Sequence, residues 1–239
     1  MSLRVLTLNL RQDLDRWTER LPLVVEALAG AAANVVALQE VALPISQDRL
    51  VATMLNDAGL PYAVHTAPKW GDQNAEAVSL LTLAPARDHA VIALPGAGGR
   101  VAQRVVVATA GGDVAVVNTH LHHEPYDDES VRLPQAEAIL AWLEDDGLLD
   151  RCVVVGDLNA SPGSPTVRTL QGRLTSLLPD GTPTFPTPLA AGDFSPVQID
   201  HVMVASGLAG SARLVADRGH PDDASLWPSD HLGVCADIQ

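Results

Sequence analysis

Short apolar runs recur along the whole chain, and each has the length of a single β-strand. They predict strands at Leu3–Leu8, Val35–Leu38, Val78–Leu83, Ala90–Ala93, Val105–Ala108, Val114–Asn118, Cys152–Val155, Ile199–Val204 and Val234–Ile238. The pair Gly111-Gly112 separates two valine-rich runs, which is a signal for a hairpin turn. At least part of the predicted sheet structure is therefore antiparallel.

Stretches with helical periodicity lie between these runs. A helix is expected after Asp15, where apolar residues recur on one face at Trp17, Leu21, Val24 and Leu28. Further helices are predicted over Ser46–Ala58 with Gly59 at the end, over Pro134–Glu144, and after Ser164-Pro165, where a serine cap precedes a first-turn proline. The stretch Leu178–Pro196 is rich in Pro, Thr and Gly and predicts a long loop.

The chain shows no internal repeat and no shift in composition that would mark a domain boundary. Strands alternate with helices and part of the sheet is antiparallel, so we expect a mixed α/β fold. A length of 239 residues is enough for a sizeable core. We therefore predict a single domain over residues 1–239.

Polar residues gather where the apolar runs end. They lie in the segments Leu6-Thr7-Leu8-Asn9, Val36-Ala37-Leu38-Gln39-Glu40, Val117-Asn118-Thr119-His120, Val154-Val155-Gly156-Asp157-Leu158-Asn159 and Ser229-Asp230-His231. Several strand ends can direct carboxylates, amides and imidazoles to one point, and oxygen-rich clusters suit hard divalent cations. Each segment alone is also typical of a cap or a turn. The prediction of a metal site therefore depends on all of them together.

Taken together, these segments resemble the endonuclease/exonuclease/phosphatase superfamily of metal-dependent phosphoesterases. The resemblance is carried by Asn9, Gln39-Glu40, Asn118-Thr119-His120-Leu121, Gly156-Asp157-Leu158-Asn159, Ile199-Asp200-His201 and Ser229-Asp230-His231. It covers nearly the whole chain, from Asn9 to His231. The resemblance implies a four-layer α/β/β/α sandwich with two packed mixed sheets. It also implies hydrolysis of a P–O bond by metal-assisted in-line attack of water, with a phosphodiester favoured over a monoester.

The same resemblance implies a metal site. Glu40 would be the main carboxylate ligand of Mg2+ or Mn2+, with help from Asn9 and Asp230. One or two ions would be present, and a second ion would lie near Asp157, Asn159 and His231.

The resemblance further implies the catalytic residues. Asp157 would orient or deprotonate the attacking water, Asn159 would position water and phosphate, and His231 and His120 would flank the phosphate. Glu76 would orient His120, raise its pKa and fix its tautomer, and Asp200 would support the site from its own strand.

At several positions this sequence differs from the family pattern, and these differences bear on the identity of the substrate. Arg11 stands where abasic-site enzymes carry an acid and pancreatic-type deoxyribonucleases carry an arginine, so we predict that it contacts substrate. Ala77 replaces the usual glycine, Thr82-Leu83 the usual Ser-Arg pair, and His201 the usual aromatic residue after the strand aspartate.

The cluster His120-Leu121-His122-His123 allows more than one interpretation. In a strand, His120 and His122 would face the same side and could share a metal, as in zinc hydrolases of the metallo-β-lactamase type. That motif continues with an Asp-His pair, whereas His123 is followed here by Glu-Pro. We favour a substrate-contacting loop that contains His122, His123 and Tyr126, and exposed loop histidines are the alternative.

Charge limits the substrate further. The formal net charge is -14, and Lys69 is the only lysine. The surface field should oppose tight binding of nucleic acid, which favours a small organic phosphoester. A nucleic acid substrate stays open, because divalent ions can bridge two anionic surfaces. A catalytically silent binding protein and glycoside-type chemistry at the same carboxylates are the alternatives to a phosphoesterase.

The remaining expectations concern the environment of the protein. The sequence has no apolar run of about 18 residues, the length that a membrane-spanning helix needs, and its start does not resemble a signal peptide. Cys152 and Cys235 lie in apolar runs and are expected to be buried free thiols. We predict a cytoplasmic protein with no membrane span and no obligate protein partner.

Overall fold

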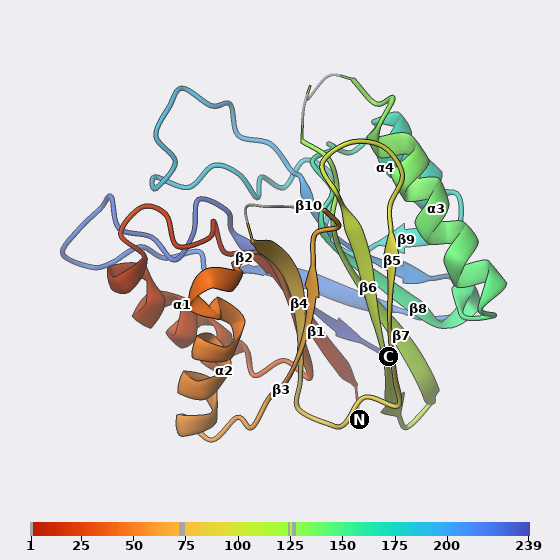
Figure 1. Cartoon of the computed structure of the whole chain (residues 1–239), viewed down its shortest axis with the longest axis horizontal. Helices are drawn as coiled ribbons and strands as arrows, with labels where there is room; N and C mark the ends of the chain where they lie inside the picture. The colour runs from red at the N-terminus through yellow and green to blue at the C-terminus, as the bar shows by residue number, and fades with distance from the viewer. Residues whose placement is uncertain (1, 72–74, 124, 126–127) are drawn as a thin grey trace.

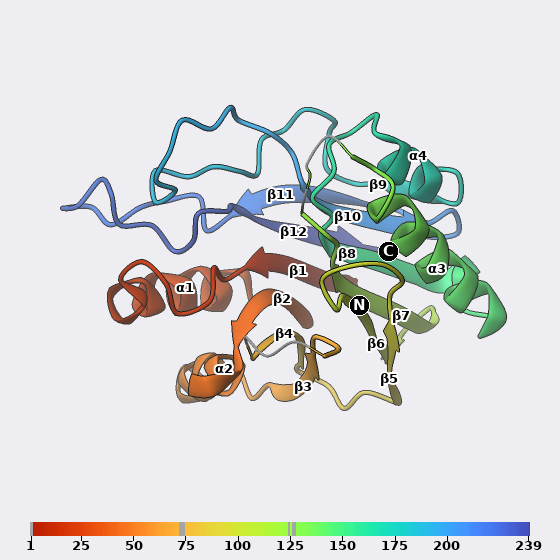
Figure 2. The same cartoon turned by 45° about the horizontal axis from the view of Figure 1, so that its top comes forward.

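The computed structural model describes residues 2–71, 75–123, 125 and 128–239. Within them, two six-stranded β-sheets face each other (Figures 1 and 2). The first sheet has the order β11 (Gly210–Val215), β12 (Gly233–Ile238), β1 (Leu3–Asn9), β2 (Val35–Ala42), β4 (Glu76–Thr82) and β3 (Ala63–Pro68). The second has the order β5 (Asp88–Ala93), β6 (Val101–Thr109), β7 (Gly112–His120), β8 (Cys152–Asp157), β10 (Asp200–Ala205) and β9 (Leu174–Ser176).

Helices cover the outer face of each sheet. In Figure 1, α1 (Trp17–Ala31) and α2 (Gln47–Asp57) lie on one side, and α3 (Arg132–Asp145) and α4 (Pro165–Gln171) lie on the other. Two short 3-10 turns, Leu43–Ile45 and Leu149–Arg151, complete the regular elements of the described residues. The resemblance to a four-layer α/β/β/α sandwich is therefore confirmed.

The apolar core follows the layers. Alternate residues of β1 point to opposite faces: Val5 joins the cluster between the sheets, and Leu6 and Leu8 join the cluster beneath α1 and α2. A third cluster lies between the second sheet and its helices, and includes Val117 and Ile139. Because both faces of the central strands are buried, their sequences read as nearly continuous apolar runs.

The predicted strands and helices are all present, with ends shifted by a few residues. The hairpin at Gly111-Gly112 joins β6 and β7, and the Ser164 hydroxyl accepts a hydrogen bond from the Val167 amide at the start of α4. The pattern of apolar runs did not predict β3, β9 and β11. These strands lie at sheet edges, and β3 and β11 have few buried residues, so their sequences lack the apolar runs of the central strands.

The alternative in which His120 and His122 share one face of a strand does not fit the structure. β7 ends at His120, and His122 lies beyond it in irregular chain, where strand alternation does not apply. The predicted loop Leu178–Pro196 does run without helix or strand apart from an isolated bridge from Phe185 to Val197. Cys152 and Cys235 are buried and free, as predicted. None of the helices in the described chain is long and apolar enough to cross a bilayer.

The sheet topology brings the polar strand ends together. β1 and β2 run parallel, with Asn9 beside Gln39, and β7 and β8 run parallel, with His120 beside Asp157. β10 runs antiparallel to β8 and begins at Asp200, directly opposite Asp157. The polar ends of both sheets therefore meet at one edge of the sandwich.

Candidate active site

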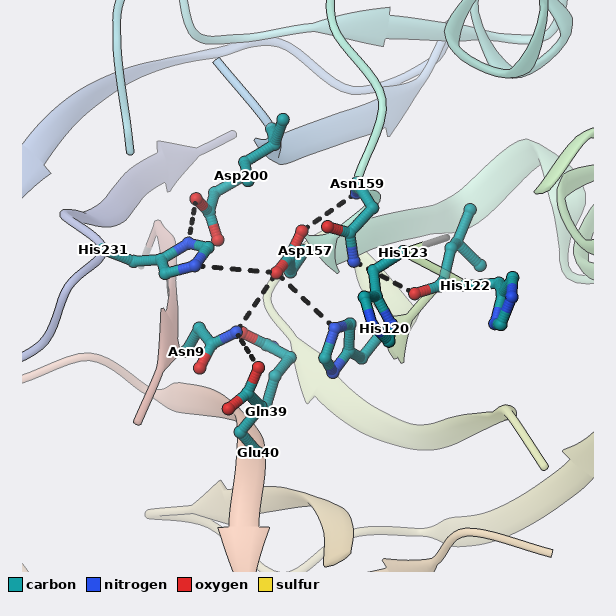
Figure 3. A network of polar contacts seen from close by, with 12 residues as sticks. Asn9, Gln39, Glu40, His120, His122, His123, Asp157, Asn159, Asp200 and His231 are labelled. Carbon is teal, nitrogen blue, oxygen red and sulfur yellow. Dashed lines mark hydrogen bonds and ion pairs between the residues drawn. The ribbon is translucent and has the colours of Figure 1, made fainter. Parts of the chain in front are cut away.

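Asp157 lies at the centre of this edge (Figure 3). Its Oδ2 atom accepts a hydrogen bond from Asn9 Nδ2 at 3.1 Å and lies 3.6 Å from His120 Nε2 and 3.9 Å from His231 Nε2. Its Oδ1 atom accepts from the Asn159 amide at 2.9 Å. The side chain is 2% exposed, so these contacts act in a low-dielectric environment. Groups from both sheets thus converge on one carboxylate.

The glycine before Asp157 is required by the packing of β8 on β7. Gly156 has a φ of 138°, and a Cβ atom there would lie 1.9 Å from the Thr119 carbonyl oxygen. The close approach of the two strands sets the position from which Asp157 projects.

His231 is held by Asp200. Its Nδ1 atom lies 2.9 Å from Asp200 Oδ2, which leaves Nε2 facing Asp157. Burial opposes the charged imidazolium, but the carboxylates of Asp200 and Asp157 outweigh it and raise the pKa of His231 to about 10. His231 is therefore protonated at neutral pH and can donate a hydrogen bond or a proton.

His120 has the opposite protonation state. Its Nδ1 atom lies 3.5 Å from Glu76 Oε1, and the resemblance implied that this carboxylate raises the pKa of His120. Glu76 does raise the pKa of His120, but burial and the charge of Arg100 outweigh it and lower that pKa to about 4. Glu76 itself is buried, yet His120 and Lys69 lower its pKa to about 2. The site therefore pairs one charged histidine with one neutral histidine.

Glu40 reaches the site through an irregularity in β2. The pairing of β2 with β4 shifts register between Leu38 and Val41, and Glu40 has a φ of 50°. Its Oε1 atom accepts a hydrogen bond from Asn9 Nδ2 at 3.2 Å. Burial and the negative charge of Glu76 raise the pKa of Glu40. Glu40 is thus a half-buried carboxylate with other carboxylates nearby.

Gln39, its neighbour, has a structural role. The Gln39 amide donates to the Thr7 hydroxyl at 3.0 Å and to the Asn118 side chain at 2.7 Å. The Asn118 amide in turn donates to the carbonyls of Leu38 and Ser79. This network joins the two sheets directly beneath the site.

Arg11 forms an ion pair with Asp230. The Arg11 guanidinium also contacts Asp15, and its backbone amide donates to Asn9 Oδ1 at 2.9 Å. The Ser229 hydroxyl donates to the Asn9 carbonyl at 2.6 Å, which ties the segment before β12 to the end of β1. The residue predicted to contact substrate therefore lies against a residue predicted to bind metal.

The residues present fit a divalent cation. Asn9 Nδ2 donates to the carboxylates of both Glu40 and Asp157, so an amide dipole lies where a cation would bind in their combined negative field. Among the described residues, Asp157, Asp200 and His231 also form a group whose ligand atoms all lie within 4.8 Å of one another. This group differs from the predicted ligands Glu40, Asn9 and Asp230, which stay a prediction.

A pocket of about 750 Å³ opens over these residues. Its lining comprises Gln12, Glu40, Lys69, Glu76, Arg100, His120, His123, Asp157, Asn159, Phe185, Phe194, Ser195, Pro196, Val197, Ile199 and His231. The wall from the loop before β10 is largely apolar, and Phe185 packs 5.2 Å from Phe194 and 5.0 Å from His231 between ring centres. Lys69 and Arg100 add two cationic side chains to the lining.

The other predicted site residues lie around this pocket. Asn159 donates to the Leu121 carbonyl at 3.1 Å and lines the pocket, as does His123. His122 points away from Asp157, beyond His120 (Figure 3), and its amide donates to the Gln135 side chain. Tyr126 lies outside the described residues.

Sequence reasoning missed Gln12, Lys69 and Arg100 as pocket residues. Lys69 could have been found, because the only lysine of an acidic chain is a distinctive position. Gln12 and Arg100 follow no motif and reach the pocket only through the folding of their loops.

A family model and several solved structures match this chain. The sequence model of the Endonuclease/Exonuclease/phosphatase family matches residues 6–231. The endonuclease/exonuclease/phosphatase from Bacteroides vulgatus superimposes with a TM-score of 0.80 at 20% identity, covering 100% of this chain and 99% of that one. The mannosyl-6-phosphatase of Bacteroides thetaiotaomicron VPI-5482 superimposes with a TM-score of 0.79 at 16% sequence identity, and the match covers 100% of each chain. The human Nocturnin catalytic domain with bound sulfate superimposes with a TM-score of 0.76 at 21% sequence identity, and the match covers 100% of this chain and 93% of that one. No curated protein matches the sequence.

Proposed function

The chain belongs to the Endonuclease/Exonuclease/phosphatase family, and from this premise we propose that it is a divalent-metal-dependent phosphoesterase. It hydrolyses a P–O bond by metal-assisted in-line attack of water. The observation that carries the proposal is the convergence of Asn9, His120 and His231 on one oxygen of Asp157. Because this site draws on both sheets, we also propose that residues 1–239 act as one domain.

In this mechanism, Asp157 orients the attacking water and takes its proton. The carboxylate is held by hydrogen bonds from the Asn9 side chain and the Asn159 amide, so it has little freedom to turn away from the water. The Asn159 side chain, tied to the Leu121 carbonyl, lies on the pocket wall and positions water and phosphate.

The two histidines divide the work on the phosphate. His231, charged and held by Asp200, donates a hydrogen bond to a phosphate oxygen and supplies the proton that the leaving oxygen needs. His120 is neutral and its single N–H, at Nδ1, faces Glu76, so Nε2 accepts a hydrogen bond from the attacking water without adding charge. Glu76 and Asp200 act by positioning these rings.

Glu40 and Asn9, with Asp230, would hold Mg2+ or Mn2+. When bound, the cation neutralises phosphate charge and stabilises the pentacovalent transition state. The raised pKa of Glu40 supports this assignment, because a half-buried carboxylate in a negative field gains strongly from a nearby cation.

We propose a phosphodiester as the substrate, and a small organic phosphoester rather than a long nucleic acid. The formal net charge of -14 disfavours tracking along a phosphate backbone. The fold itself leaves the substrate open, since both a mannosyl-6-phosphatase and the Nocturnin catalytic domain share it.

The test is hydrolysis of bis(p-nitrophenyl) phosphate and p-nitrophenyl phosphate with EDTA, Mg2+, Mn2+ or Zn2+. We expect release with Mg2+ or Mn2+, loss with EDTA, and loss in Asp157→Ala. Asp113→Ala removes an exposed carboxylate far from the pocket and serves as the matched control. Undiminished activity in folded Asp157→Ala, or rescue by Zn2+ alone, would contradict the proposal.

A further inference from the structure

A second, smaller pocket adjoins the first on its polar side. It has a volume of about 400 Å³ and is lined by Lys69, Trp70, Gly71, Gly98, Gly99, Arg100, His122 and His123. Lys69, Arg100 and His123 also line the main pocket, so the two are contiguous. We call this smaller space the side pocket. Its size is that of a site for part of a small ligand.

The side pocket concentrates cationic and imidazole groups. It holds Lys69, the only lysine of a chain with a formal net charge of -14, together with Arg100, which is 3% exposed. Both contact the carboxylate of Glu76: Lys69 Nζ lies 2.6 Å from Oε2, and Arg100 Nη1 lies 3.9 Å from Oε1. Arg100 Nη2 also lies 3.0 Å from His123 Nδ1. Glu76 thereby fixes both cations at the junction of the two pockets.

The backbone around these side chains is held in place. The Lys69 amide donates to the Glu76 carbonyl at 3.0 Å, and the Trp70 amide donates to the Gly99 carbonyl at 2.7 Å. A Cβ atom at Gly99 would lie 2.1 Å from the Trp70 carbonyl oxygen, so only glycine allows this close approach. The side pocket is therefore built by tight contact between two loops. Trp70, which also lines the side pocket, is 76% exposed.

The side pocket lies in a defined direction from the reaction centre at Asp157. Figure 3 places His122 and His123 beyond His120, on the side of Asp157 away from His231. His231 is the proposed donor to the leaving oxygen, so the side pocket receives the part of the substrate that lies away from the leaving group. Lysine and arginine side chains bind phosphate oxygens through strong, charge-assisted hydrogen bonds.

We propose that the substrate carries a second phosphate group, which binds in the side pocket to Lys69 and Arg100 while the scissile phosphate lies at Asp157. This inference rests on the proposed phosphoesterase function and narrows its substrate class to esters with two phosphate groups. The second phosphate is a terminal group of a small molecule or the neighbouring phosphate of a short oligonucleotide.

The test uses a matched pair of diesters, thymidine 5′-(p-nitrophenyl phosphate) with and without a 3′-phosphate. Wild-type protein should show kcat/KM at least about tenfold higher for the 3′-phosphorylated compound, the effect of one charge-assisted contact. Lys69→Met should reduce this preference to about threefold or less, and Lys69→Arg should retain it. Because Lys69 contacts Glu76, the ratio of the two substrates is the readout, and any loss common to both cancels.

Binding without turnover provides the independent readout. In EDTA, calorimetry should give tighter binding of thymidine 3′,5′-bisphosphate than of thymidine 5′-phosphate by at least about tenfold, and Lys69→Met should lose the difference. The dinucleotide pTpT distinguishes a bridging phosphate from a terminal one. If Lys69→Met does not fold, Lys69→Gln takes its place. Arg87→Met, which removes an exposed charge elsewhere, controls for net charge.

Two results would overturn the inference: a wild-type preference below about twofold, or a preference that Lys69→Met leaves unchanged. If neither diester is hydrolysed, the phosphoesterase proposal fails, and the binding experiment still decides the role of the side pocket.

Discussion

Arg20 is a fully buried arginine that holds the loop after β1, and its replacement is expected to cost much of the stability of the protein. Its guanidinium donates to the backbone carbonyls of Leu10, Gln12, Leu14, Asp15 and Pro228. These contacts join the segment that carries Arg11 to the segment before Asp230. Arg20→Met keeps the apolar part of the side chain and removes every one of these donors.

The expected loss in the free energy of unfolding follows from the carbonyl oxygens that Arg20→Met leaves without a hydrogen-bond donor. The bonds to the Leu10 and Pro228 carbonyls are buried, whereas the other three are partly buried and their acceptors can reach water. A hydrogen bond to a charged group contributes about 1.5–3 kcal/mol, so losing the two buried ones costs about 3–6 kcal/mol. For a chain of this length, that corresponds to a fall in Tm of roughly 6–24 °C.

The measurement is urea and thermal unfolding of wild type, Arg20→Met, Arg20→Lys and Arg87→Met. Arg20→Lys keeps the charge with fewer donors and should fall between wild type and Arg20→Met. Arg87, whose side chain is 62% exposed in its pair with Asp113, should change the free energy of unfolding by less than about 0.5 kcal/mol when replaced. The reasoning is refuted if Arg20→Met lies within about 1 kcal/mol of wild type.

Further predictions concern titration, thiols and metal. Burial and the nearby His89 lower the pKa of His65 below 6.5, so the unfolded chain binds more protons as the pH falls. The free energy of unfolding should therefore decrease from pH 7 to pH 5, and His65→Gln should flatten that slope; identical slopes would contradict this. Burial raises the pKa of both Cys152, to about 12, and Cys235, so Ellman's reagent should label neither thiol in native protein and both in urea. Fast labelling of native protein would refute that account. Glu40→Gln should weaken Mn2+ binding in calorimetry by at least about tenfold, and unchanged affinity would place the metal elsewhere.

The central part of the fold could be predicted because its strands are buried on both faces. Such strands contain runs of valine and leucine that no loop would carry, as in Val114–Asn118. The edge strands β3 and β11 could not be found in this way, because a strand that packs on one side needs few apolar residues. Their position depends on hydrogen bonds to β4 and β12, which are properties of the folded sheet.

The site was predictable in its residues and less so in its electrostatics. The motifs predict Asp157 and both histidines as site residues, but the lowered pKa of His120 depends first on its burial and then on the charge of Arg100, and both arise only in the folded protein. The role of Arg20 could not be predicted from the sequence, because its partners are backbone carbonyls, which every residue has. The side-chain direction of Glu40 depends on a register shift that the alternation of a regular strand does not anticipate.

Because the site is divided between two sheets, the spacing between the sheets sets the distances between the site residues and therefore affects the proposed catalysis. Asn9 and Glu40 are fixed to one sheet, and His120 and Asp157 to the other, so the 3.1 Å hydrogen bond from Asn9 to Asp157 spans the gap. The valine layer between the sheets acts as a spacer that sets this distance. A substitution that thickens or thins that layer would change the distance between the catalytic residues of the two sheets. It would thereby alter turnover without replacing any polar residue.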